Sequence, residues 1–79
     1  MQSIGELRRS LESSLPPIVP RSGIQKYGIP YSEGFLANLD SRGEGPAGAV
    51  KIGRKVCYPR DSLITWLIAR STAKDREAR

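Results

Sequence analysis

Apolar residues recur at helical spacing near the start of the chain. They lie three or four positions apart, with charged residues between them: Ile4, Leu7, Leu11 and Leu15. This spacing predicts an amphipathic α-helix within residues 1–17, which Pro16 and Pro17 end. Ser3 and Glu6 match the S-x-x-E capping box, in which each side chain satisfies a free backbone donor. We expect the apolar stripe to pack on its own domain, and dimerisation through it is the alternative.

Two shorter helices are predicted between residues 20 and 40. Pro20 suits the first position of one helix, Gly28 suits the left-handed residue after its end, and Ile24 and Tyr27 would point inward. The other helix extends from about Tyr31 to Asp40. The apolar residues of this helix lie within one arc: Phe35, Leu36 and Leu39. The opposite face carries Glu33, Ala37 and Asn38. Two short helices joined at a glycine are typical of a helix-turn-helix.

A glycine-rich loop follows over residues 40–49 and contains a literal G-x-G-x-x-G, from Gly43 to Gly48. The nucleotide-binding form of this motif follows a strand and opens a helix, whose N-terminus binds the pyrophosphate. Here a helix is expected before the motif, a strand after it, and Pro46 occupies its middle. Arg54 also stands where a P-loop requires lysine. We therefore expect no nucleotide site.

A β-hairpin is predicted over residues 49–59, and two registers are possible. A two-residue turn pairs Ile52 with Lys55 and leaves Val50 opposite Cys57. A three-residue turn pairs Ile52 with Val56 and Val50 with Tyr58, which gathers four apolar side chains on one face. Because a slip of one residue would expose that set, burial favours the second register.

The favoured register predicts which hairpin side chains meet solvent. Lys51 and Cys57 would face outward together, and Arg54 and Lys55 would lie at the tip. Cys57 is interpreted as an ordinary strand residue, because no base accompanies it.

The last predicted helix follows Pro59, which ends the strand, and carries Asp61 in its first turn. Its apolar residues cover roughly 200° of the helix surface, more than one face; they are Leu63, Ile64, Trp66, Leu67 and Ile68. Trp66 or Ile68 must therefore contact something besides the hairpin. The N-terminal helix is the expected partner, with a second subunit as the alternative. We expect residues 71–79 to form a polar tail that frays, with extension of the helix as the alternative.

Composition adds a basic charge balance to this pattern. The chain of 79 residues has 13 Lys and Arg against 8 Asp and Glu, a net charge of +5. So short a chain indicates one domain with a modest core and no deep catalytic cavity. The charge favours a polyanionic partner, nucleic acid before an anionic membrane, although a solvated surface explains it equally well.

The residue types that the sequence lacks argue against several classes of function. The chain has one cysteine and no histidine, which excludes an internal disulfide, a Cys/His zinc site and a His-based triad. No apolar run approaches the roughly 20 residues of a membrane span. Glu6, Arg8 and Arg9 interrupt the apolar core that a signal peptide would need. We expect a cytoplasmic, reduced protein with no metal and no cofactor.

Three sequence motifs carry a resemblance to a known family: Val50–Val56 (VKIGRKV), Pro59–Leu63 (PRDSL) and the pair Trp66–Leu67. In these motifs and in element order, the chain resembles the small winged-helix domains of phage and plasmid excisionases and the related MerR-like regulators. The likeness covers roughly residues 18–70 and extends more weakly through Gly28-Ile29. The family usually places Ser or Thr after that pair, where this chain has Pro30.

The resemblance implies an α+β, mostly α, winged helix-turn-helix with a two-stranded hairpin wing and a C-terminal helix. The domain would occupy residues 18–70, between the N-terminal helix of residues 1–17 and the tail of residues 71–79. In the family, the second helix of the pair enters the major groove of DNA, and the wing approaches an adjacent groove or the backbone. Candidate DNA-binding residues are Arg21, Lys26, Tyr31, Ser32, Asn38, Arg42, Lys51, Gly53, Arg54 and Lys55.

Local chemistry suits several of these residues to DNA. Arg54 and Lys55 on a stiff turn can contact phosphates, and Gly53 permits close approach. The amide of Asn38 has the donor and acceptor that read adenine. On the same helix, Tyr31 and Ser32 can reach phosphates or base edges, whereas the carboxylate of Glu33 could accept from cytosine but would repel phosphate. Three further cations could contact the DNA backbone or simply be solvated surface residues: Arg21, Lys26 and the loop residue Arg42.

The function implied by the resemblance is sequence-specific binding of double-stranded DNA by a mobile-element, prophage-type excisionase. Such a protein bends attachment-site DNA so that a phage-type integrase recombines it in the excising direction. The integrase is a further expected partner, and several copies of the chain are expected to bind DNA cooperatively. We expect the protein to be associated with the nucleoid and to have no membrane partner. The alternatives are a transcription regulator with the same domain and a protein–protein adaptor. No enzyme activity is expected.

Overall fold

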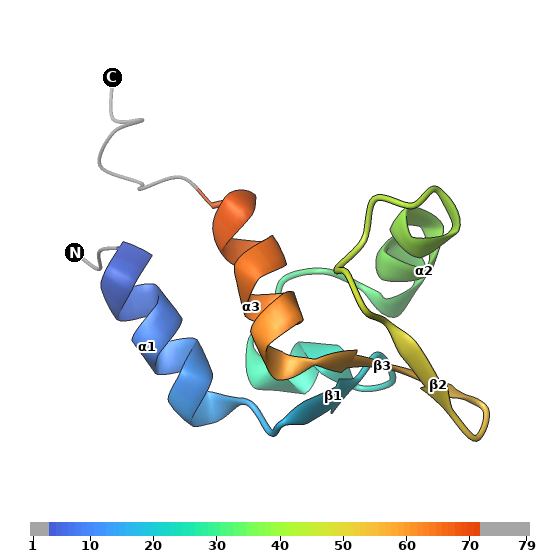
Figure 1. The fold of residues 1–79 in the computed structure, drawn as a ribbon, viewed down its shortest axis with the longest axis horizontal. Coiled ribbons are helices and arrows are strands. Elements are labelled where there is room, and N and C mark those ends of the chain that lie inside the picture. The colour runs from blue at the N-terminus through green and yellow to red at the C-terminus, as the bar shows by residue number, and fades with distance from the viewer. Residues whose placement is uncertain (1–3, 72–79) are drawn as a thin grey trace.

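The computed structural model describes residues 4–71 and has an α+β fold of three helices and a three-stranded antiparallel sheet (Figure 1). The elements in chain order are α1 (Ile4–Ser14), β1 (Ile18–Pro20), a short 3-10 helix η1 (Ile24–Tyr27), α2 (Glu33–Ser41), β2 (Val50–Ile52), β3 (Lys55–Pro59) and α3 (Arg60–Ala69). Ser3 of the predicted capping box and residues 72–79 of the predicted tail lie outside the described residues.

The sheet has the strand order β1-β3-β2, so β3 is central and the other two strands are edges. Strand β1 is a correction to the sequence analysis, which placed Pro20 at the start of a helix. Val19 lies opposite Tyr58 in the sheet, and Pro20 lies opposite Cys57. Proline is tolerated on an edge strand because its missing N–H need not serve a second neighbour.

The segment after β1 contains the predicted short helix, which begins later than expected, at Ile24. The side chain of Ile24 is fully buried, and that of Tyr27 is half-buried. Gly28 follows the helix with φ 85° and ψ 6°, which confirms the predicted left-handed residue.

Helix α2 begins two residues later than predicted and ends one residue later. Ser32 is its N-cap, and the Ser32 hydroxyl accepts a hydrogen bond of 3.1 Å from the backbone N–H of Phe35. This serine cap stands two residues after Pro30. Leu36 and Leu39 are buried as expected, whereas Phe35 lies at the margin of the buried face.

The predicted hairpin register is wrong. Strands β2 and β3 pair Ile52 with Lys55 and Val50 with Cys57, as a two-residue turn requires. Gly53 has φ 65°, and no residue other than glycine has positive φ within residues 4–71, which fits a type II′ turn. The prediction assumed that four apolar side chains share a buried face. Instead, Val50 and Ile52 remain on the open face of an edge strand.

Cys57 is consequently buried, with 5% of its surface exposed, and does not face outward beside Lys51. It lies on the sheet face opposite the core, flanked by its strand partners Pro20 and Val50. The core face instead carries Val19, Val56 and Tyr58.

One hydrophobic cluster joins the elements. Its buried members are Leu15, Val19, Ile24, Ile29, Leu36, Tyr58, Leu63, Ile64 and Leu67. Helix α1 packs on α3, which confirms the predicted contact between the N-terminal and C-terminal helices. Trp66 finds a different partner, because its indole Nε1 donates a 2.9 Å hydrogen bond to the carbonyl of Glu44 in the loop before β2. No helix within residues 4–71 has the length and apolar character needed to cross a membrane.

Truncating a core residue of α3 should destabilise this small domain severely. Leu63 is fully buried, and Leu63→Ala is expected to lower the free energy of unfolding by about 2–5 kcal/mol through lost burial and a cavity. Thr65→Ala, at an exposed position of the same helix, should change it by less than about 0.5 kcal/mol. Urea unfolding followed by circular dichroism measures both, and equal effects would contradict the core assignment.

Candidate nucleic-acid interface

Helix α2 presents a narrow face of small and polar residues to solvent. At about 100° per residue, the side opposite buried Leu36 and Leu39 carries Gly34, Ala37, Asn38 and Ser41. The side-chain amide of Asn38 makes no hydrogen bond within residues 4–71, so its donor and acceptor are available to a ligand. The Ser41 hydroxyl donates a 2.8 Å hydrogen bond to the carbonyl of Asn38.

The sequence analysis missed Gly34 and Ser41 on this face. Helical spacing would have found them, since they lie four residues before and three residues after Asn38. The predicted helix end at Asp40 left Ser41 out of the pattern.

The hairpin tip collects three cations at the same end of the molecule as α2 (Figure 1). Lys51, Arg54 and Lys55 are all exposed, and within residues 4–71 no carboxylate pairs with any of them. Gly53 completes the turn, with open space where a side chain would stand. The structure therefore brings together four of the predicted site residues as an unneutralised basic tip.

Three other predicted cations have partners inside the protein. Arg21 forms a 2.8 Å ion pair with Asp40, and Arg42 forms a 3.2 Å ion pair with Glu44. Lys26 lies with its ammonium 5.7 Å from the centre of the Tyr27 ring. The Arg42 pair is exposed on both sides, and such pairs are worth little, so Arg42 can be recruited by another anion.

The residues predicted to read DNA from the start of α2 are occupied by structural contacts. The Ser32 hydroxyl caps the helix, as described above. Glu33 accepts a 2.7 Å hydrogen bond from the backbone N–H of Gly23, which ties α2 to the preceding segment. Tyr31 packs against Phe35 and Trp66 at ring-centre distances of 5.1 and 5.7 Å. These contacts fix Tyr31, Ser32 and Glu33 in place at the start of α2.

Arg70 completes the aromatic cluster and was not singled out from the sequence. Its guanidinium lies 4.9 Å from the Trp66 ring, 5.3 Å from Tyr31 and 5.8 Å from Phe35. Its Nε also donates a 3.3 Å hydrogen bond to the Tyr31 hydroxyl. The signal was the four-residue spacing from Trp66 to Arg70 on one helix. The cluster joins the start of α2 to the end of α3.

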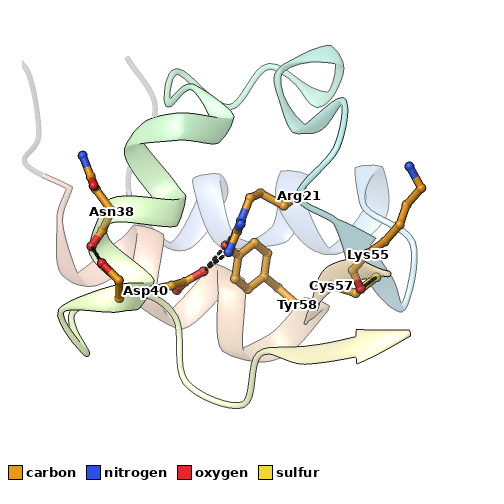
Figure 2. A network of polar contacts seen from close by, with 7 residues as sticks. Arg21, Asn38, Asp40, Lys55, Cys57 and Tyr58 are labelled. Atoms are coloured by element: carbon orange, nitrogen blue, oxygen red, sulfur yellow. Dashed lines mark hydrogen bonds and ion pairs between the residues drawn. The ribbon is translucent and has the colours of Figure 1, made fainter. Parts of the chain in front are cut away.

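A polar network holds the other end of α2 against the sheet (Figure 2). The Tyr58 hydroxyl donates a 2.6 Å hydrogen bond to the Asp40 carboxylate, and Arg21 donates one of 2.8 Å to the same oxygen. The Nε of Arg21 also donates to the Tyr58 hydroxyl at 3.2 Å. In Figure 2, Asn38 and Lys55 lie on either side of this network and point away from it.

The surroundings raise the pKa of both donors in this network, Tyr58 and Arg21. Burial raises the pKa of the Tyr58 phenol above its usual value of 10.0, and the hydrogen bond to Asp40 raises it further. The hydrogen bond from Arg21 to Tyr58 is the largest cause of a raised pKa for the guanidinium, with Asp40 adding to it against desolvation. Both groups therefore keep the protons that they donate.

The loop between α2 and β2 depends on a glycine at position 45. A Cβ placed on Gly45 would overlap Oδ1 of Asp40. Only glycine lets the loop backbone pass this close to the carboxylate. The Asp40 side chain thus ties the last turn of α2 to the sheet and lies against the loop that leads into the hairpin.

The described residues contain no group of three acidic or sulfur side chains placed to hold a metal ion. No protein family, curated protein or solved structure matches this chain.

Replacing Tyr58 with Phe should change how stability depends on alkaline pH. Because the folded pKa of Tyr58 lies above its unfolded value, the phenol contributes stability that is full below about pH 10 and falls as pH rises through the folded pKa. Tyr58→Phe should have a free energy of unfolding about 1–3 kcal/mol lower than wild type near neutral pH. At alkaline pH its free energy of unfolding should fall less than that of wild type. Urea unfolding between about pH 8 and 12 tests this, and parallel curves for the two proteins would contradict it.

The contact between Gly45 and Asp40 can be measured by a double-mutant cycle. In the wild-type background, Gly45→Ala should displace the Asp40 carboxylate and lower the free energy of unfolding. In the Asp40→Ala background, the same substitution should lower it less, because the carboxylate that the new methyl group would meet is absent. The coupling energy is expected to be about 0.5–3 kcal/mol. Additive losses in the free energy of unfolding would rule out the contact.

Proposed function

We propose that this protein binds double-stranded DNA as a winged-helix domain, with α2 as the recognition helix and the β2–β3 hairpin as the wing. The observation that carries the proposal is the distribution of free charge. Lys51, Arg54 and Lys55 have no internal counterion within residues 4–71, and the hairpin that carries them lies at the same end of the molecule as α2 (Figure 1). Unpaired cations on a stiff turn attract phosphates without first breaking an ion pair.

The exposed face of α2 fits the major groove. That groove is about 12 Å wide and admits a helix, and the small residues Gly34, Ala37 and Ser41 allow the helix backbone to lie close to base edges. Asn38 is the reader, because its free amide can bind adenine through a donor and an acceptor together. The Ser41 hydroxyl is a second polar contact within reach of bases or phosphates.

The other candidate residues divide into contacts and supports. Arg42 contacts phosphate once it leaves Glu44, and Gly53 lets the wing backbone approach the duplex. Arg21 acts as a support, because its guanidinium holds Asp40 and thereby the end of α2. Tyr31 and Ser32 support the start of α2, Tyr31 by packing on Trp66 and Ser32 by capping the helix.

Within DNA-binding proteins, we propose an excisionase-like factor of a mobile element. The motifs VKIGRKV and PRDSL favour that family, and a small domain with one helix and one wing makes few contacts per copy. It would act without bond chemistry, in the cytoplasm and on the nucleoid, by shaping DNA for an integrase, with several copies bound side by side. A palindromic target and no neighbouring integrase gene would instead favour a transcription regulator with the same domain.

The salt dependence of duplex binding tests the role of the wing. For Arg54→Ala and for Lys55→Ala, the slope of log affinity against log salt should become shallower by about 0.9, because each variant loses one phosphate contact. Fluorescence anisotropy of a labelled duplex at about 50–200 mM salt measures the slope.

Two controls make this result specific. Arg9→Ala removes the same charge from an exposed position of α1, at the far end of the long axis (Figure 1), and should leave the slope unchanged. Asn38→Ala removes no charge and should reduce discrimination between duplex sequences at an unchanged slope. A slope unaltered by both wing variants, with circular dichroism showing intact folds, would remove the wing from the interface.

A further inference from the structure

The sheet has an apolar face that nothing in residues 4–71 covers fully. The strand pairing places Ile18, Val50 and Ile52 on the side opposite the core, and they are 40%, 45% and 56% exposed. Ile52 is the most exposed large apolar residue in the described part of the chain. A hairpin shifted by one residue would have turned Ile52 toward the core, so its exposure is a consequence of the turn that this sequence adopts.

The position of Ile52 makes it unusual. It directly precedes the Gly53-Arg54 turn and lies opposite Lys55. The hairpin residues 49–59 include three cations and no acidic residue. An aliphatic side chain therefore stands at the tip of a basic hairpin, between cations that can each hold a phosphate.

We propose that Ile52 is a wedge that enters the minor groove of DNA and partly unstacks a base step, so that the duplex bends. This inference rests on the proposed function, since it requires the wing to lie on DNA. Apolar side chains inserted in this way kink DNA toward the major groove, and the cost of unstacking is offset by the added contacts of the bent duplex.

The dimensions of the hairpin fit this role. The minor groove is about 6 Å wide, whereas the two strands of a hairpin are already about 4.8 Å apart before their side chains are counted. The turn can enter the groove, because Gly53 has no side chain, but the strands can follow only if the groove opens. Unstacking by Ile52 would open it, while Arg54 and Lys55 hold the phosphates at its edges.

Charge selects DNA over another protein copy as the occupant of this face. Two hairpin tips that met through Ile52 would bring six cations together (three from each copy) without an acidic residue from either hairpin. Phosphates supply the opposite charge around the apolar contact. The wedge should prefer pyrimidine–purine steps such as TA, which unstack most easily.

Bending measured by energy transfer between dyes at the two ends of a duplex tests the wedge. Wild type should bend the duplex. Ile52→Ala should lose most of the bend and roughly tenfold in affinity at an unchanged salt slope, because no charge is removed. Ile52→Leu should retain the bend. Val50→Ala is the matched control, since it shortens an exposed aliphatic side chain on the same face, two residues from the tip, and should bend DNA as wild type does.

The outcomes separate this inference from the proposed function. Equal bending by wild type and Ile52→Ala, or binding by wild type without bending, would overturn the wedge and leave DNA binding intact. Sedimentation that shows wild type self-associating through Ile52, with bending unaffected by Ile52→Ala, would identify a protein contact and also overturn the wedge. No salt-dependent binding by wild type would overturn the proposed function itself, and the wedge with it.

Discussion

The placement of α2 relative to the hairpin depends on one carboxylate. Asp40 accepts hydrogen bonds from Tyr58 on the central strand and from Arg21 after the first strand, and its side chain fills the space that Gly45 leaves open. Three segments distant in sequence therefore meet at one group. In a domain with so small a core, a partly buried charge-assisted contact of this kind specifies a relative orientation that apolar packing alone leaves loose.

The basic residues serve two different purposes. Some neutralise or cover internal groups, as Arg21 does with Asp40 and Arg70 does with the ring of Trp66. Others, at the hairpin tip, have no counterion within residues 4–71. The cations are thus unevenly available to a partner, and three without a counterion in the described part of the chain gather at the hairpin tip, at the same end of the long axis as α2 (Figure 1). Charge distribution, rather than total charge, carries the proposed interface.

Local patterns in the chain predicted much of the fold. Helical periodicity, prolines and the glycine after Tyr27 indicated three helices and a short fourth one, with ends wrong by a few residues. The basic hairpin tip was also predictable, because a turn glycine and its neighbours are adjacent in sequence. The first strand was not, since a run of only three residues that contains proline, Ile18–Pro20, has no period of its own. Its identity comes from pairing with β3.

The sequence by itself determined which residues could be cationic contacts and which segments would be helical, because both properties are local. Only the tertiary structure decided the hairpin register, the burial of Cys57 and the ion pair of Arg21 with Asp40. The register followed from the turn and from the core face already set by Val19 and Tyr58. Arg21 pairs with Asp40, a residue 19 positions away in the sequence. Contacts between residues so far apart depend on how the elements pack, and a local pattern carries no record of that packing.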